Sequence, residues 1–424
     1  MFSPNITSVV IPDSVTSIGR NAFYSCDSLS NVVLSNNLIS IGSYAFAYCN
    51  SLTKIELPSS LKTIDEGAFY YSGLSSIDIP RYVDLVATNT FFACPLSYIH
   101  VSDLNLNFTS VEGVLFNKSL TELIQYPIAS TSTTYTIPSS VSLLSPASFM
   151  GSANLQTVDL SNVENIQPNT FQYCSKLKEF NIPKSLKYFG DGAVLGDNNL
   201  TKFSVDSENK SLYTDSYGAL YDYSNNQLLC LPAGFTGDSF TVLKGTESLG
   251  NTAILGVNSL KTLTIQDGVT SLDMNSIYNC NNLETIKLPS SLNSINLNVY
   301  GQSFDNYTLP SLKTIIVDND YTYNTIYQYL KTWSVKNKNV NVVYASELST
   351  ATPTATIATS TTTTGISTST QAVSIATSTV TATTTAATST ATSQTTKTGD
   401  VSSISLVLAS LAGIAGVGVF KKRK

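Results

Sequence analysis

The sequence repeats a short apolar pattern with a nearly constant period. The pairs Ala22-Phe23, Ala45-Phe46 and Ala68-Phe69 follow one another at intervals of 23 residues. A block of the form Leu-x-x-apolar-x-apolar, such as LTKIEL at 52–57, recurs between these pairs and onward along the chain. One such unit cannot bury its own apolar residues, so neighbouring units must stack and share a core. The period and the leucine spacing therefore predict a β-rich leucine-rich-repeat solenoid with a parallel sheet and 22–23-residue repeats.

Alternation within the leucine block predicts which side chains face the core. In LTKIEL, Leu52, Ile55 and Leu57 are expected to point inward. Lys54 and Glu56 are expected to point outward, because successive side chains of a strand face opposite sides.

Prolines and glycines mark the turns of each repeat. Gly19 and Gly42 precede the Ala-Phe pair and are expected to supply backbone freedom there. A proline at the end of the strand would stop ladder pairing and turn the chain. This proline recurs at Pro12, Pro58, Pro80, Pro138, Pro183 and Pro289.

A second, longer period is superimposed on the first. The segment EGVLFNKSLTELIQYP at 112–127 resembles YGALYDYSNNQLLCLP at 217–232, and Gly113 and Gly218 are 105 residues apart. Each segment consists of two apolar runs around a polar turn, which predicts a β-hairpin. We therefore expect two β-hairpin insertions in the solenoid.

The repeat motifs resemble those of the BspA-type leucine-rich repeats of surface proteins. The segment CNSLTKIELPSSLKTIDEGAFY at 49–70 carries the resemblance best, and the likeness extends over most of residues 5–344. It implies a secreted or cell-surface solenoid, at 1–344, that serves attachment or ligand binding and is not an enzyme. The Tyr-rich stretch 321–333 is expected to cap the last apolar face.

The C-terminal part has a different composition. In 349–396, 39 of 48 residues are Ser, Thr or Ala and none is charged, so this segment lacks the apolar surface to form a core. We expect a disordered stalk at 345–397 and a membrane anchor or sorting signal at 398–424. Residues 401–420 are uncharged and end at a tetrabasic tail, which predicts one transmembrane helix with a cytoplasmic tail.

The start of the anchor resembles the wall-sorting signal of Gram-positive surface proteins. In that signal, sortase cleaves between Thr and Gly of LPxTG, which corresponds here to Thr398 and Gly399. Thr395 and Thr396 stand where the signal has Leu-Pro, so the anchor is a degenerate one. Cleavage by sortase and retention as a membrane helix both stay open. Met1 begins within a repeat without a signal-peptide pattern, so we expect the true start to lie upstream.

Composition argues against catalysis and nucleic-acid binding. The one histidine, His100, is too few for Ser-His-Asp chemistry or the usual zinc sites, and its strand position predicts an outward side chain. The net charge is −6 although the basic tail contributes +4, which opposes nucleic-acid binding. DNDY at 318–321 lacks the loop spacing of a calcium site. No metal or cofactor is therefore expected.

The cysteines indicate packing. Five of the six occupy one repeat position, which other repeats fill with Ser72, Ser152, Asp197 and Val257. Such interchange favours buried free thiols, with Cys26 and Cys49 as the one pair near enough in sequence to form a disulfide.

The outward strand positions are the candidate ligand face. They are polar and of mixed sign, which favours a protein or glycan of a host or neighbouring cell as the partner. The residues are Asn31, Val33, Lys54, Glu56, Ser76, Asp78, Thr157, Asp159, Glu179, Asn181, Lys202, Ser204, Thr262, Thr264, Thr285 and Lys287. We hypothesise a wall- or membrane-anchored adhesion protein with the solenoid outside the cell. The alternative is a passive envelope or spacer protein without a specific ligand.

Overall fold

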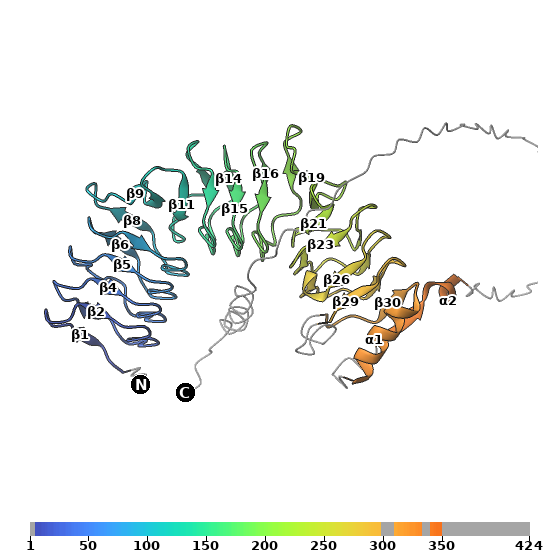
Figure 1. Cartoon of the computed structure of the whole chain (residues 1–424), viewed down its shortest axis with the longest axis horizontal. Helices are drawn as coiled ribbons and strands as arrows, with labels where there is room; N and C mark the ends of the chain where they lie inside the picture. The colour runs from blue at the N-terminus through green and yellow to red at the C-terminus, as the bar shows by residue number, and fades with distance from the viewer. Residues whose placement is uncertain (1–4, 298–308, 333–339, 350–424) are drawn as a thin grey trace, which may run out of the picture. The chain divides into compact units, whose positions relative to one another are not determined.

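The computed structural model describes residues 5–297, 309–332 and 340–349. These all belong to the first of two compact units, 1–354 and 355–424. The described chain winds into stacked coils, with short strands of successive coils side by side (Figure 1). Each regular coil has two strand positions and one turn, which we call the first ladder, the second ladder and the turn layer. The predicted stalk beyond residue 349, the 401–420 segment and the Thr398-Gly399 site lie outside the described residues.

The first ladder contains the strands of the leucine blocks. Its parallel pairs keep corresponding repeat positions in register, for example Asp78 opposite His100. The block 52–57 is not assigned as a strand, although Leu52 and Ile55 are buried as predicted and Leu57 is half-buried. The strands are β1(Ser8–Val10), β3(Asn31–Val33), β6(Ser76–Ile79), β8(Tyr98–Val101), β12(Thr134–Thr136), β14(Thr157–Asp159), β16(Asn181–Ile182), β18(Ser204–Val205), β22(Ser239–Thr241), β25(Thr262–Thr264), β28(Thr285–Lys287), β30(Thr314–Val317) and β31(Asn341–Tyr344).

The second ladder follows the proline turn of each repeat. In these turns the proline carbonyl accepts a hydrogen bond from the backbone N–H three residues later, as Pro58 O does from Leu61 N at 3.1 Å. The prolines therefore turn the chain as predicted. The strands are β2(Ser17–Ile18), β4(Ser40–Ile41), β5(Thr63–Ile64), β7(Leu85–Val86), β11(Glu122–Gln125), β13(Leu143–Leu144), β15(Asn165–Ile166), β17(Tyr188–Phe189), β21(Gln227–Cys230), β23(Ser248–Leu249), β26(Ser271–Asp273) and β29(Ser294–Asn296).

The turn layer has an alternating backbone that the sequence did not reveal. In several repeats the residues two before and two after the central apolar residue are left-handed, as at Tyr44 (φ 55°) and Tyr48 (φ 58°) around Phe46. The N–H groups of the two left-handed residues and of the central residue donate to the next repeat, as Phe23 N does to Ala45 O at 2.8 Å. The N–H groups between them bond within their own turn, as Ala45 N does to Gly42 O at 3.1 Å. This layer includes the short strands β24(Ile254–Leu255) and β27(Ile277–Tyr278) and the 3-10 turn η1(Met274–Ser276).

Gly19 and Gly42 do not supply the backbone freedom that was predicted for them, so this prediction is wrong. Neither glycine has a positive φ. A Cβ at Gly42 would lie 2.9 Å from the backbone oxygen of Ile18, so close approach of two repeats explains this glycine. The left-handed positions are instead taken by residues such as Tyr44, whose steric cost is offset by the hydrogen bonds between repeats.

The core is a column of apolar side chains through the stack. The rings of Phe23 and Phe46 are stacked with centroids 5.1 Å apart, Phe46 and Phe69 at 5.6 Å, and Phe69 and Phe91 at 5.9 Å. Phe46, Phe69 and Phe91 are buried. The Ala-Phe period thus corresponds to one aromatic rung of the core per repeat.

Each predicted hairpin exists but belongs to a three-stranded meander. The first adds β9(Phe108–Val111) and β10(Val114–Asn117) before β11, and the second adds β19(Leu212–Thr214) and β20(Leu220–Asp222) before β21. All neighbouring strands of each meander pair antiparallel. Strands β11 and β21 also belong to the second ladder, so the last strand of each meander is at the same time a strand of the solenoid.

The inserted strands divide the described core into three clusters. Leu115 packs with the cluster before β10, whereas Val114 and Phe116 pack with the one after it. Likewise, Leu220 belongs to the cluster before β20, and Ala219 and Tyr221 to the one after it. Both faces of these strands are therefore buried, which explains their continuous apolar runs.

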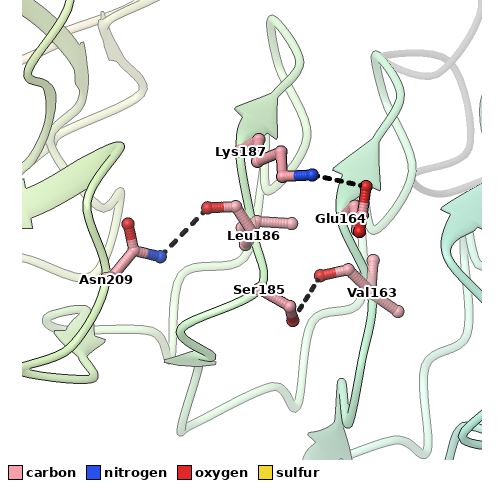
Figure 2. Close-up of polar contacts among 6 residues, drawn as sticks. All are labelled: Val163, Glu164, Ser185, Leu186, Lys187 and Asn209. Carbon is pink, nitrogen blue, oxygen red and sulfur yellow. Dashed lines mark hydrogen bonds and ion pairs between the residues drawn. The ribbon is translucent and has the colours of Figure 1, made fainter.

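A buried asparagine ties each insertion to the preceding repeat. Asn209 Nδ2 donates to Pro183 O at 2.7 Å and to Leu186 O at 3.0 Å, and its Oδ1 accepts from two backbone N–H groups. Figure 2 shows the bond from Asn209 Nδ2 to Leu186 O, the ion pair that joins Lys187 to Glu164 and the bond from Ser185 Oγ to Val163 O. Asn105 makes the same four-bond arrangement in the first insertion.

The Tyr-rich segment forms helix α1(Asp320–Thr332), followed by β31 and helix α2(Ala345–Ser349). Ile326 is buried, and Tyr323, Tyr329 and Leu330 pack against the last core cluster. The segment covers apolar surface as predicted, but β31 continues the first ladder beyond it. Helix α2 begins at residue 345, where the stalk was expected to start.

Candidate functional site

The predicted ligand face lies on the outward side of the first ladder. Two columns of side chains run along it, because each strand presents two outward positions in register with those of its neighbours. Thr262 lies opposite Thr285, and Thr264 opposite Lys287. Asn181 lies opposite Ser204 and hydrogen-bonds to it.

Accessibility agrees with the predicted orientation at every one of these positions. The exposed residues are Asn31, Val33, Lys54, Glu56, Ser76, Asp78, Asp159, Glu179, Asn181, Lys202 and Ser204. The half-buried ones are Thr157, Thr262, Thr264, Thr285 and Lys287. The face is thus continuous within each run of repeats. It is polar and carries both positive and negative side chains.

Charged groups on the face pair locally. Lys54 Nζ lies 2.9 Å from Glu56 Oε1, and this hydrogen bond raises the pKa of Lys54. His100 is exposed, as predicted, and its Nδ1 lies 3.2 Å from Asp78 Oδ1. Such exposed pairs contribute little to stability, so these groups stay available to a partner.

The cysteines are packed thiols. All six are free, including Cys26 and Cys49, so this pair does not form a disulfide. Cys94 Sγ donates to Phe69 O of the preceding repeat at 2.8 Å and contacts Ser72 Oγ at 3.3 Å, which explains why serine substitutes in this position. Burial raises the pKa of Cys94 to about 12. Within the described residues, no three His, Cys, Asp or Glu side chains are grouped so as to hold a metal ion.

The sequence reasoning missed an aromatic row on the turn layer. It consists of Tyr24, Tyr48, Tyr70, Tyr71 and Phe92, all half-buried. Tyr48 stacks on Tyr71 with centroids 5.3 Å apart, and Tyr70 on Phe92 at 4.5 Å. The signal was present as aromatic residues directly beside the Ala-Phe pairs, but only the cross-repeat register brings the rings together.

The aromatic row ends at a cavity of about 260 Å³, which we call the first notch. One wall is Thr88–Phe92 in the turn layer, and the facing wall is Ser145–Ala147 two turns further on. Glu122, Ile124 and Gln125 of β11 also line it. The notch exists because β7 and β11 are not paired, so the second ladder is interrupted at the first insertion.

Backbone groups at the first notch are left without partners. In the preceding repeat, Phe69 N donates to Thr90 O at 3.0 Å. The corresponding N–H groups of Asn89 and Phe91 have no acceptor among the described residues, and Pro146 O on the facing wall has no donor there. Glu122 Oε1 accepts a hydrogen bond from Ser145 Oγ, at 2.5 Å, while Oε2 has no bond within the described part of the chain.

No helix in the described part of the chain has the length and apolar character needed to cross a membrane.

Stacked parallel 22–23-residue coils with leucine blocks define a leucine-rich-repeat solenoid. The family model described as "BspA type Leucine rich repeat region (6 copies)" matches residues 1–122, 107–221 and 236–347. The chain therefore belongs to the BspA-type leucine-rich-repeat family, which confirms the resemblance seen in its motifs. No curated protein matches it in sequence.

Three solved structures are similar to this chain. The pneumococcal vaccine antigen PcpA is 21% identical, with 80% of this chain and 79% of that chain covered and a TM-score of 0.46. A leucine-rich repeat protein from Eubacterium ventriosum is also 21% identical, with 80% and 81% covered and a TM-score of 0.47. A leucine rich cell surface protein from Faecalibacterium prausnitzii is 22% identical, with 69% and 79% covered and a TM-score of 0.40.

Proposed function

We propose that this chain is a non-catalytic cell-surface recognition protein that binds a protein or glycan ligand through the outward side of its first ladder. The observation that carries the proposal is the alignment of exposed polar side chains in two columns. A solenoid places such columns on one extended surface, so a partner can contact several repeats at once.

The C-terminal sequence supports a location at the cell surface. A Ser/Thr/Ala-rich stalk would hold the solenoid away from the envelope, and the uncharged segment 401–420 would retain it. In this proposal the chain is cleaved between Thr398 and Gly399 or stays in the membrane, and labelling of the mature C-terminus by mass spectrometry distinguishes the two.

The test is a binding screen of the full chain against extracellular-matrix proteins, mucins and a glycan array. The face variant changes Lys54, Glu56, Asp78, Asp159, Glu179 and Lys202 to Ala. A matched control variant changes exposed or half-buried charges on the second ladder: Lys62, Asp84, Glu164, Lys187 and Glu247, also to Ala.

Saturable binding that is lost in the face variant and kept in the control variant is the expected result. Equal binding by wild type and both variants would show that the ligand binds somewhere other than the first ladder. A folded wild-type protein that binds none of the probes would favour the passive spacer instead.

A further inference from the structure

The first notch has the chemistry of a small-ligand site and is separate from the first-ladder face. We propose that it binds one uncharged pyranose residue of a glycan. This inference does not depend on the proposed function, because it uses other residues on another side of the coil.

The aromatic wall supplies a flat apolar contact. Phe92 stacks on Tyr70 with an interplanar angle of 6°, so one face of its ring is covered. No ring in the described structure stacks on its other face, and Phe92 lines the notch. The carbon-bound hydrogens on one side of a pyranose ring form a complementary surface, because they are electropositive and the aromatic face is electronegative.

The polar groups around the ring match hydroxyl groups. Among the residues that the structure describes, the N–H groups of Asn89 and Phe91 are donors without acceptors, whereas Pro146 O and Glu122 Oε2 are acceptors without donors. A hydroxyl both donates and accepts, so neighbouring sugar hydroxyls can satisfy both kinds of group. Leaving a buried N–H such as that of Phe91 unpaired is costly, which gives a ligand that pairs with it an energetic advantage.

Volume and charge narrow the ligand class. The cavity of about 260 Å³ is slightly smaller than the usual range for small-molecule pockets, about 300–1,000 Å³, so it accommodates one ring with the rest of the glycan outside. Among the described residues, Glu122 is the only charged one that lines it, and its carboxylate repels acidic sugars. An uncharged hexose or N-acetylhexosamine is therefore favoured over a sialic or uronic acid.

The second insertion provides an internal comparison. The corresponding notch, between the turn at Gly192–Leu195 and the strand β21, has a volume of only about 20 Å³. Leu195 stands there in place of Phe92, and Gln227 in place of Glu122. The second copy thus has neither the ring, nor the carboxylate, nor the space.

The test uses this difference between the copies. The full chain, as wild type, Phe92→Leu and Glu122→Gln, is applied to an array of neutral and sialylated oligosaccharides. Binders are titrated with the free monosaccharides. Both substitutions install the residue of the second copy, and circular dichroism and thermal unfolding verify the fold. Leu195→Ala at the second notch and the face variant serve as controls.

We expect wild type to bind a neutral glycan, with affinity reduced about tenfold or more by either substitution and unchanged in both controls. If Phe92→Leu fails to fold, the glycan affinity of Glu122→Gln alone tests the proposal. The proposal is overturned if no neutral saccharide binds, if sialylated glycans are preferred, or if neither substitution weakens binding. Glycan binding lost only in the face variant would refute the notch while supporting the proposed function.

Discussion

Asp197 is a buried carboxyl whose replacement should stabilise the protein at neutral pH. It occupies the cysteine position of its repeat and has an exposed fraction of 0%. Neither of its carboxyl oxygens has a hydrogen-bond partner within the described part of the chain. Burial raises its pKa well above the usual value, and its charge would raise the pKa of the nearby Cys174 and Cys230 thiols. The perturbation is Asp197→Ser, which installs the residue found at the same position in Ser72 and Ser152.

The magnitude follows from proton linkage. An aspartate in the unfolded chain has a pKa of about 3.9, so above that pH the unfolded state loses a proton that the folded state keeps. The contribution of this carboxyl to stability is therefore most favourable below about pH 3.9 and falls as the pH rises toward the raised pKa of the folded state, by about 1.4 kcal/mol per pH unit. Because burial raises the pKa of the folded carboxyl well above its usual value, this cost is present at pH 7.

Asp197→Ser should thus raise the free energy of unfolding by more than about 1.4 kcal/mol at pH 7 and by little at pH 4. Urea unfolding of the full chain, followed by far-ultraviolet circular dichroism at both pH values, measures this difference. Asp103→Ser, at an exposed position, controls for the change in net charge. Equal effects of Asp197→Ser at the two pH values, or destabilisation at pH 7, would refute the reasoning.

Three further predictions concern packing, insertion and thiol chemistry. Phe69→Ala removes a buried ring stacked between Phe46 and Phe91 and should lower the free energy of unfolding by about 3–5 kcal/mol, measured by urea titration. Asn209→Ala removes four hydrogen bonds at a buried position and should cost about 3 kcal/mol or more in the same assay; a cost under about 1 kcal/mol would contradict its structural role. Because burial raises the pKa of Cys94 to about 12, iodoacetamide at pH 8 should leave it unmodified in the folded chain and alkylate it in urea, as read by mass spectrometry.

Several features of the fold were predictable because they depend on local spacing. The leucine block of 23-residue units predicts which side chains are buried, and Leu52 and Ile55 are buried while Lys54 and Glu56 are exposed. The outward orientation of His100 followed from the same alternation. The candidate face was therefore predictable as a set of positions, since burial of one side of a strand determines the other.

Other features depend on contacts between repeats and were not predictable from one unit. Backbone freedom was expected from Gly42 before the Ala-Phe pair, yet Tyr44 and Tyr48 take the left-handed conformation in that repeat, because hydrogen bonds to the next repeat stabilise it. The two predicted hairpins did not include β9 and β19. These strands pair with β10 and β20, whose apolar runs face two core clusters.

The sequence by itself determined the solenoid, its period, its two insertions and the side of each strand that faces solvent. These follow from the burial of apolar residues at fixed spacing, which is a property of each repeat. Only the tertiary structure decided how far the stack opens at the first insertion, which brings Phe92, the free N–H of Phe91 and the carboxylate of Glu122 around one cavity. The physical reason is that an insertion displaces one coil from the next, and the size of the resulting notch depends on side chains far apart in the sequence.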